Sequence, residues 1–238
     1  MTRGWWCLLL AAVAALAVAC SSSSSSSGDN ATATASKTAF ASNTASASQT
    51  VAATANCPAS AVDTGVPNMK TYTAAPAMTI DPSKTYTATV KTVRGDFTIK
   101  LRPDLAPKHV NSFVFLARDG YFDHVTFHRV IPGFVAQTGD QTGTGSGSPG
   151  YMIPLEATTS LPYAAGVVGM ARTTDPNSAG SQWFIAYAPA PSLDGQYTVF
   201  GQVTSGMDVV DCLTPRDPSQ SPNAAPGDKI IAITIAES

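Results

Sequence analysis

The sequence predicts a fold dominated by antiparallel β-structure, arranged as a sandwich or a barrel. Extended apolar runs are short and numerous, glycines punctuate the connections between them, and only two segments have the pattern of a helix. Many short strands with glycine-rich turns are typical of sandwiches and barrels. Hydrophobic periodicity alone does not choose between these two architectures.

Residues 1–19 have the composition of a secretory signal peptide. A short basic start is followed by an almost wholly apolar stretch that ends at Cys20. This stretch is shorter than the roughly 20 apolar residues that a membrane-spanning helix needs. Residues 17–20, Ala-Val-Ala-Cys, resemble a bacterial lipobox, in which the signal is cut before a cysteine that then carries lipid. A leucine is usual where Ala17 stands, and the alternative is an ordinary small-residue cleavage site.

Residues 20–56 are rich in serine, alanine and threonine. Such a composition buries too little apolar surface to offset chain entropy, so this segment is predicted to be a disordered tether behind the lipidated Cys20. Residues 57–84 contain several prolines and no clear period, and they predict an irregular extension packed on the folded domain. Residues 85–238 are predicted to form that single domain.

Two alternating runs, residues 86–92 and 97–102, predict a β-hairpin whose connection contains Gly95. Residues 107–119 predict a helix, because Pro107 suits the first turn and apolar residues recur at helical spacing from Val110 to Ala117. Gly120 can close this helix in a left-handed conformation. A second helix is predicted at residues 206–213. Further strands are expected at residues 126–130, 134–138, 167–172, 183–187, 198–203 and 230–235.

The charge and the cysteines narrow the function classes. The formal net charge is -2 and only 13% of residues are charged, which gives no indication of a nucleic-acid surface. Cys7 would leave with the signal peptide and Cys20 would carry lipid. Cys57 and Cys212 are predicted to form a disulfide in an exported protein, and two buried free thiols are the alternative. No cysteine and histidine spacing of the zinc-binding kind occurs, so no metal is expected.

Residues 127–140 carry the clearest functional signal. Two extended runs flank a Pro132-Gly133 turn. Polar side chains that can bind a ligand, such as Arg129 and Gln137, lie there among aromatic and branched apolar residues. A few polar groups among apolar ones are typical of the lining of a ligand groove.

This stretch resembles the cyclophilin family of peptidyl-prolyl isomerases. The resemblance continues in Gly-Met-Ala-Arg at residues 169–172, in residues 180–185 and in residues 193–201, and it covers residues 85–236. It implies a closed eight-stranded antiparallel β-barrel capped by two α-helices, and therefore decides for the barrel. It also implies catalysed cis–trans rotation about X–Pro bonds, whose uncatalysed turnover takes tens to hundreds of seconds.

The same resemblance assigns the site residues. Arg129 would be the catalytic residue, Gln137 would bind a substrate carbonyl, and Gln182 would order the arginine. Four apolar side chains would form the pocket for the proline ring: Phe134, Val135, Phe184 and Leu193. The remaining groove-lining residues would be Ala171, Arg172, Thr173 and Tyr197.

The chain departs from the best-known eukaryotic pattern at several positions. Val135 replaces a methionine, Arg172 and Thr173 replace Asn-Ala, and Tyr197 replaces a histidine. Ser192 stands where a tryptophan helps to bind cyclosporin. We expect catalysis to survive these changes and cyclosporin binding to be weakened.

Residues and resemblance together predict an exported isomerase, lipid-anchored on the extracytoplasmic side of a cell membrane, that assists protein folding there. Its substrates would be proline-containing polypeptides, and we expect a monomer without nucleic-acid partner, cofactor or metal. A hydrolase is disfavoured, because Ser181 does not lie in a Gly-x-Ser-x-Gly elbow. The stronger alternative is a proline-peptide binding module or chaperone with little turnover.

Overall fold

The computed structural model describes residues 57–158, 160–221 and 223–238. The predicted signal peptide, Cys20 and the tether lie outside the described residues. The secondary-structure elements, in chain order, are β1 (Tyr86–Thr92), β2 (Gly95–Leu101), α1 (Pro107–Arg118), β3 (Arg129–Ile131), β4 (Val135–Thr138), β5 (Val167–Met170), β6 (Trp183–Ala186), the 3-10 helix η1 (Pro191–Leu193), β7 (Val199–Ser205), α2 (Met207–Asp211) and β8 (Ile230–Glu237).

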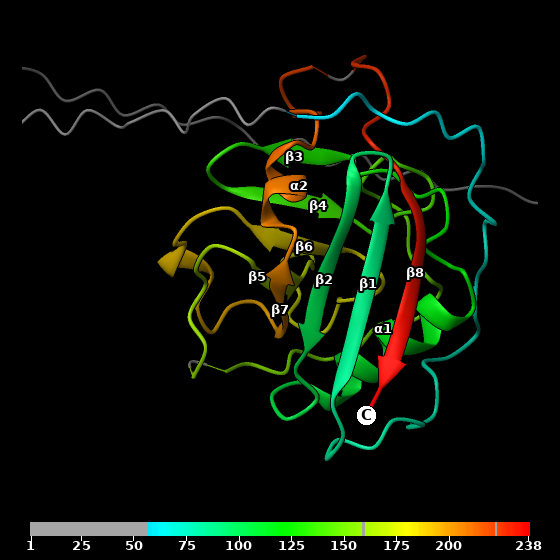
Figure 1. The fold of residues 1–238 in the computed structure, drawn as a ribbon. Helices are drawn as coiled ribbons and strands as arrows, with labels where there is room; N and C mark the ends of the chain where they lie inside the picture. Colours follow the sequence, from blue (N-terminus) through cyan, green and yellow to red (C-terminus); the bar gives the residue numbers. More distant parts are fainter. Residues whose placement is uncertain (1–56, 159, 222) are drawn as a thin grey trace, which may run out of the picture. The chain divides into compact units, whose positions relative to one another are not determined.

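The eight strands form one antiparallel sheet in the order β3-β4-β6-β5-β7-β2-β1-β8, curled as a half-barrel (Figure 1). Helix α1 packs against β8 and helix α2 against β2. The predicted eight-stranded antiparallel fold with two helices is confirmed. The hairpin of β1 and β2 pairs as expected, with Thr92 opposite Gly95 at the turn.

Closure of the barrel differs from the prediction. Within the described residues, the edge strands β3 and β8 share no ladder. A short seam joins this side instead: Ile230 N–H donates to the Val125 carbonyl at 2.8 Å, and Phe127 N–H donates to the Asp228 carbonyl at 2.8 Å. The seam uses residues just before β3, so the strand predicted at residues 126–130 begins only at Arg129.

Helix α1 supplies much of the core, as its sequence period predicted. Val110, Phe113 and Val114 are buried, and the Phe113 ring meets Trp183 edge-on at 5.7 Å. Its N-terminus has no side-chain cap from the preceding residue. The Glu156 carboxylate accepts hydrogen bonds from the first-turn N–H groups instead, including that of His109 at 3.0 Å.

Residues 57–85 contain no helix or strand and run along the surface of the domain. A disulfide joins Cys57 to Cys212 at the end of α2, as the sequence predicted. Tyr72 packs edge-on against Phe115 of α1 at 5.1 Å, and the buried Asn111 side chain accepts the Thr79 N–H at 2.8 Å. Among the described helices, none is both long and apolar enough to cross a membrane.

Candidate active site

Strand register brings three of the predicted residues together. Arg129 on β3 lies opposite Gln137 on β4, and Gln137 in turn lies opposite Phe184 on β6. Cross-strand partners point to the same face of a sheet. Arg129 and Phe184, which are far apart in the sequence, therefore lie on the same face of the sheet on either side of Gln137.

These side chains border a pocket of about 190 Å³. Nine of the residues proposed from the sequence line it: Arg129, Phe134, Val135, Gln137, Ala171, Arg172, Phe184, Leu193 and Tyr197. The other two, Thr173 and Gln182, line a larger neighbouring pocket of about 420 Å³. The structure thus gathers all of the predicted groove residues in two adjacent pockets that share Gln137, Ala171 and Arg172.

Aromatic contacts fix the wall of the smaller pocket. The Phe184 ring stacks on Tyr163 at 5.5 Å and meets Tyr197 edge-on at 5.8 Å. Gly169, opposite Phe184 on β5, makes room for the stack, since a Cβ there would lie 2.1 Å from the Tyr163 hydroxyl. Sequence reasoning missed Tyr163, because it is a lone aromatic in an irregular stretch. Burial raises the pKa of its hydroxyl well above the ordinary range.

Arg129 is half-buried at the mouth of this pocket, and its guanidinium lies 5.5 Å from the centre of the Phe134 ring. Within the part of the chain that the structure describes, it forms no ion pair and no side-chain hydrogen bond. A guanidinium is charged at any physiological pH. The pocket therefore carries a permanent cation whose N–H groups are available to a ligand.

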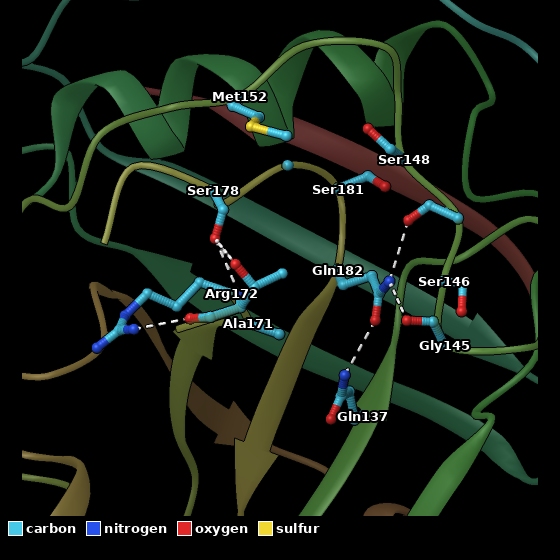
Figure 2. Close-up of a pocket in the computed structure, with 13 residues that line it drawn as sticks. Gln137, Gly145, Ser146, Ser148, Met152, Ala171, Arg172, Ser178, Ser181 and Gln182 are labelled. Atoms are coloured by element: carbon cyan, nitrogen blue, oxygen red, sulfur yellow. Dashed lines mark hydrogen bonds between the residues drawn. The ribbon is translucent and has the colours of Figure 1, made fainter. Parts of the chain in front are cut away.

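Gln182 was expected to order Arg129, but in the structure its hydrogen bonds go to other residues. Its Oε1 accepts a hydrogen bond from Gln137 at 3.0 Å, and its Nε2 donates to the carbonyls of Gly145 at 2.9 Å and Gly147 at 3.0 Å (Figure 2). Because a glutamine side chain reaches only its near neighbours, the partner is the adjacent Gln137 rather than Arg129. Gln182 thus holds the groove amide against a glycine-rich loop.

That loop, residues 143–150, forms one side of the larger pocket (Figure 2). The buried Asp140 carboxylate shapes it by accepting the N–H groups of Thr142 at 2.7 Å and Gly145 at 2.6 Å. Burial by itself would raise the pKa of Asp140. Its hydrogen bonds, led by that from the Thr142 hydroxyl, outweigh burial and hold the pKa below its ordinary value. Asp140 thus organises the glycine-rich loop.

Two other kinds of site, a serine nucleophile and a metal centre, can be compared with the geometry. The Ser181 hydroxyl is buried, donates to the Gly139 carbonyl at 2.7 Å and bonds the Tyr121 hydroxyl at 3.1 Å, so it serves the structure of the strand turn. Among the described residues, no group of three or more metal-ligating side chains is placed to hold an ion.

The curled antiparallel sheet carries a small pocket with several apolar side chains, an available guanidinium and an amide, an arrangement typical of a ligand-binding groove. A model of the family described as cyclophilin type peptidyl-prolyl cis-trans isomerase/CLD matches residues 87–235. The chain therefore belongs to the cyclophilin-type peptidyl-prolyl cis–trans isomerases, and isomerisation of X–Pro bonds is its activity by family and homology.

Individual relatives agree. A probable peptidyl-prolyl cis–trans isomerase of Brucella suis is 45% identical over 172 residues, covering 67% of this chain and 86% of the relative. A peptidyl-prolyl cis–trans isomerase-like 1 of Aspergillus niger is 41% identical over 150 residues, covering 61% and 92%. The crystal structure of a cyclophilin-type isomerase from Cryptosporidium parvum superposes with a TM-score of 0.60 at 33% identity, covering 65% of this chain and 99% of that one. It was also determined in the presence of the dipeptide Ala-Pro.

Proposed function

We propose that this chain is an exported, lipid-anchored, monomeric isomerase that assists the folding of proteins outside the cytoplasm, and that Arg129 is its catalytic residue. The observation that carries the catalytic part is the Arg129 guanidinium, which borders a pocket with apolar walls and forms no ion pair within the described chain.

The barrier to rotation about a peptide bond is about 18–20 kcal/mol, because resonance gives the C–N bond partial double-bond character. Twisting an X–Pro bond localises a lone pair on the prolyl nitrogen. A guanidinium that donates to this nitrogen stabilises the twisted state more than the planar one, which lowers the barrier. Low-dielectric walls such as Phe134 and Phe184 strengthen that interaction.

The pocket supplies the other requirements of the reaction. Phe134, Val135, Phe184 and Leu193 offer an apolar site for a proline ring, and the Gln137 amide can bind a substrate carbonyl. The Cryptosporidium relative, studied in the presence of Ala-Pro, supports a proline-containing ligand for this fold.

The test is a proline-isomerisation assay on wild type and Arg129→Ala. Loss of one preorganised donor to a transition state typically costs about 10²–10³-fold in rate, so we expect kcat/KM to fall by that order while peptide affinity is partly kept. Arg118→Gln, a change on the exposed end of α1, is the matched control and should match wild type. Full turnover in Arg129→Ala would refute the catalytic assignment, and a wild type without any acceleration would leave the peptide-binding alternative.

The location rests on residues 1–20 and on the disulfide. Structural disulfides persist mainly in oxidising compartments, which suits an exported protein. We expect the full-length protein in the membrane fraction with a lipid on Cys20, and Cys20→Ser in the soluble extracytoplasmic fraction with its activity intact. An unmodified Cys20 in mass spectra of a soluble wild type would contradict the anchor.

A further inference from the structure

The only charged side chains among the described residues that line the two pockets are arginines. Arg129 and Arg172 both border the smaller pocket, and Arg172 also borders the larger one. No aspartate or glutamate is among the described residues that line either pocket. A cleft lined by one sign of charge attracts ligands of the opposite sign.

Nearby carboxylates have other partners. Asp194, beside the pocket residue Leu193, accepts the Tyr163 N–H at 2.7 Å, and Asp175 accepts the Asn177 N–H at 2.8 Å. Hydrogen bonds from Ser219 lower the pKa of Asp217, and the positive charge of Arg129 lowers it further. Asp217 thus partly offsets Arg129. Within the described chain, Arg172 forms no ion pair with any carboxylate.

Arg172 is held in place by neutral groups. Its guanidinium lies 4.8 Å from the centre of the Tyr197 ring, and it donates from Nε to the Gln196 carbonyl and from Nη1 to the Thr173 carbonyl, each at 2.8 Å. Figure 2 shows the side chain extending away from the larger pocket. The second terminal nitrogen, Nη2, forms no hydrogen bond within the described residues. A charge fixed by stacking loses little further entropy when it binds a carboxylate.

We propose that Arg172 is a specificity-determining residue that favours substrates with aspartate or glutamate next to the proline. The proposal rests on the groove assigned above as the active site, and it names acidic X–Pro or Pro–X segments as the preferred substrate class. Arg129 acts on the imide nitrogen, and Arg172 binds the flanking acidic side chain.

The expected preference is modest, because both partners remain partly exposed to water. Ion pairs of this kind change a binding equilibrium about two- to fivefold. The preference should shrink as salt rises, since the Debye length is about 10 Å at 0.1 M ionic strength and about 3 Å at 1 M. A lysine in the same place should be disfavoured by a similar factor.

The experiment compares kcat/KM on short peptides that differ at one position, with glutamate, glutamine or lysine either directly before or directly after the proline. Wild type should turn over the glutamate peptide about two to five times faster than the glutamine peptide at one of the two positions, and the lysine peptide more slowly. In Arg172→Gln these ratios should approach one at that position. Arg118→Gln should behave as wild type.

Wild-type ratios near one at both positions, or ratios unchanged in Arg172→Gln, would overturn the proposal. A preference that did not shrink as salt rises would also overturn it, because charge would then not be the cause. These outcomes are separate from failure of the catalytic assignment, which shows as full turnover of every peptide by Arg129→Ala.

Discussion

His128 lies next to Arg129 in the sequence, but its ring points into the protein and is only 2% exposed. Neither ring nitrogen has a hydrogen-bond partner within the described residues. Burial lowers the pKa of His128 below its ordinary value of 6.5, Asp140 raises it in part, and Arg216 and Arg129 lower it again. The folded protein therefore favours the neutral form of this histidine.

We expect His128 to make the wild type less stable as the pH falls below 6.5. Below that value the unfolded chain binds a proton that the folded chain does not, so the free energy of unfolding drops until the pH reaches the lower folded pKa. One proton contributes at most about 1.4 kcal/mol per pH unit. Denaturant unfolding of wild type and His128→Leu between pH 7.5 and 5 measures this slope.

The leucine variant removes the titrating ring and should unfold with a shallower dependence on pH. Its stability at pH 7.5 should stay within about 1 kcal/mol of wild type, because the ring makes no hydrogen bond to lose within the described chain. Identical slopes in the two proteins would show that His128 is not the group responsible.

For single residues, the sequence predicted which side chains lie together when they belong to one short motif. Arg129, Phe134 and Gln137 fall within one hairpin, so their proximity follows from strand pairing. Tyr163 and Asp140 were missed because their roles depend on loops, whose paths periodicity does not specify. Gln182 was assigned the wrong partner for the same reason, since its amide reaches the glycine-rich loop that no strand pattern positions.

Among the elements, the short helix α2 depends on contacts with the rest of the protein for its stability. It has five residues, against the eight predicted, and its N-cap is Gly206, which offers no side-chain hydrogen bond. Isolated helices of this length are not stable in water. The Cys57–Cys212 disulfide at its end therefore holds both α2 and the start of the extension.

We expect the double variant Cys57→Ser/Cys212→Ser to lose about 2–5 kcal/mol of the free energy of unfolding, because the bridge closes a loop of 155 residues in the unfolded chain. Denaturant unfolding with and without reductant measures the loss. Reductant should destabilise the wild type to a similar extent and leave the double variant unchanged. Alkylation of both thiols in unreduced wild type would contradict the bridge.

Helix α1 shows what made some elements predictable. Its apolar period and Pro107 are local signals, and the structure places the helix within one residue of the prediction. The start of β3 lies instead beside the seam, and α2 ends beside the disulfide. The seam and the disulfide each join residues that are far apart in the sequence, and a local sequence pattern holds no information about such contacts.

On the scale of the whole molecule, the seam between residues 124–127 and 228–230 replaces the ladder that would close a barrel. The extension crosses this seam. The Lys229 ammonium donates to the Asp63 carbonyl at 3.0 Å and to the Gly65 carbonyl at 2.6 Å, and His124 Nδ1 lies 2.9 Å from the Asp63 carboxylate. An open edge that would otherwise offer unpaired backbone groups is thus covered.

Gly227 packs against the backbone of the seam, so a substitution there perturbs the seam directly. A Cβ at this position would lie 2.0 Å from the Phe127 carbonyl oxygen, so the backbone must move. We expect Gly227→Ala to lower the free energy of unfolding by about 1–3 kcal/mol and to open the seam. Hydrogen exchange of the Phe127 and Ile230 amides, which donate across it, should accelerate, and exposed edges should increase aggregation.

Gly133→Ala is the matched control, because its added methyl meets nothing within 4 Å and only its φ of +76° opposes the change. That backbone strain costs about 1–2 kcal/mol and should leave the Phe127 and Ile230 amides protected. A loss of stability alone would not distinguish the two variants, so the exchange rates decide. If both amides stayed as protected in Gly227→Ala as in Gly133→Ala, the seam would not be what keeps the two edges of this sheet together.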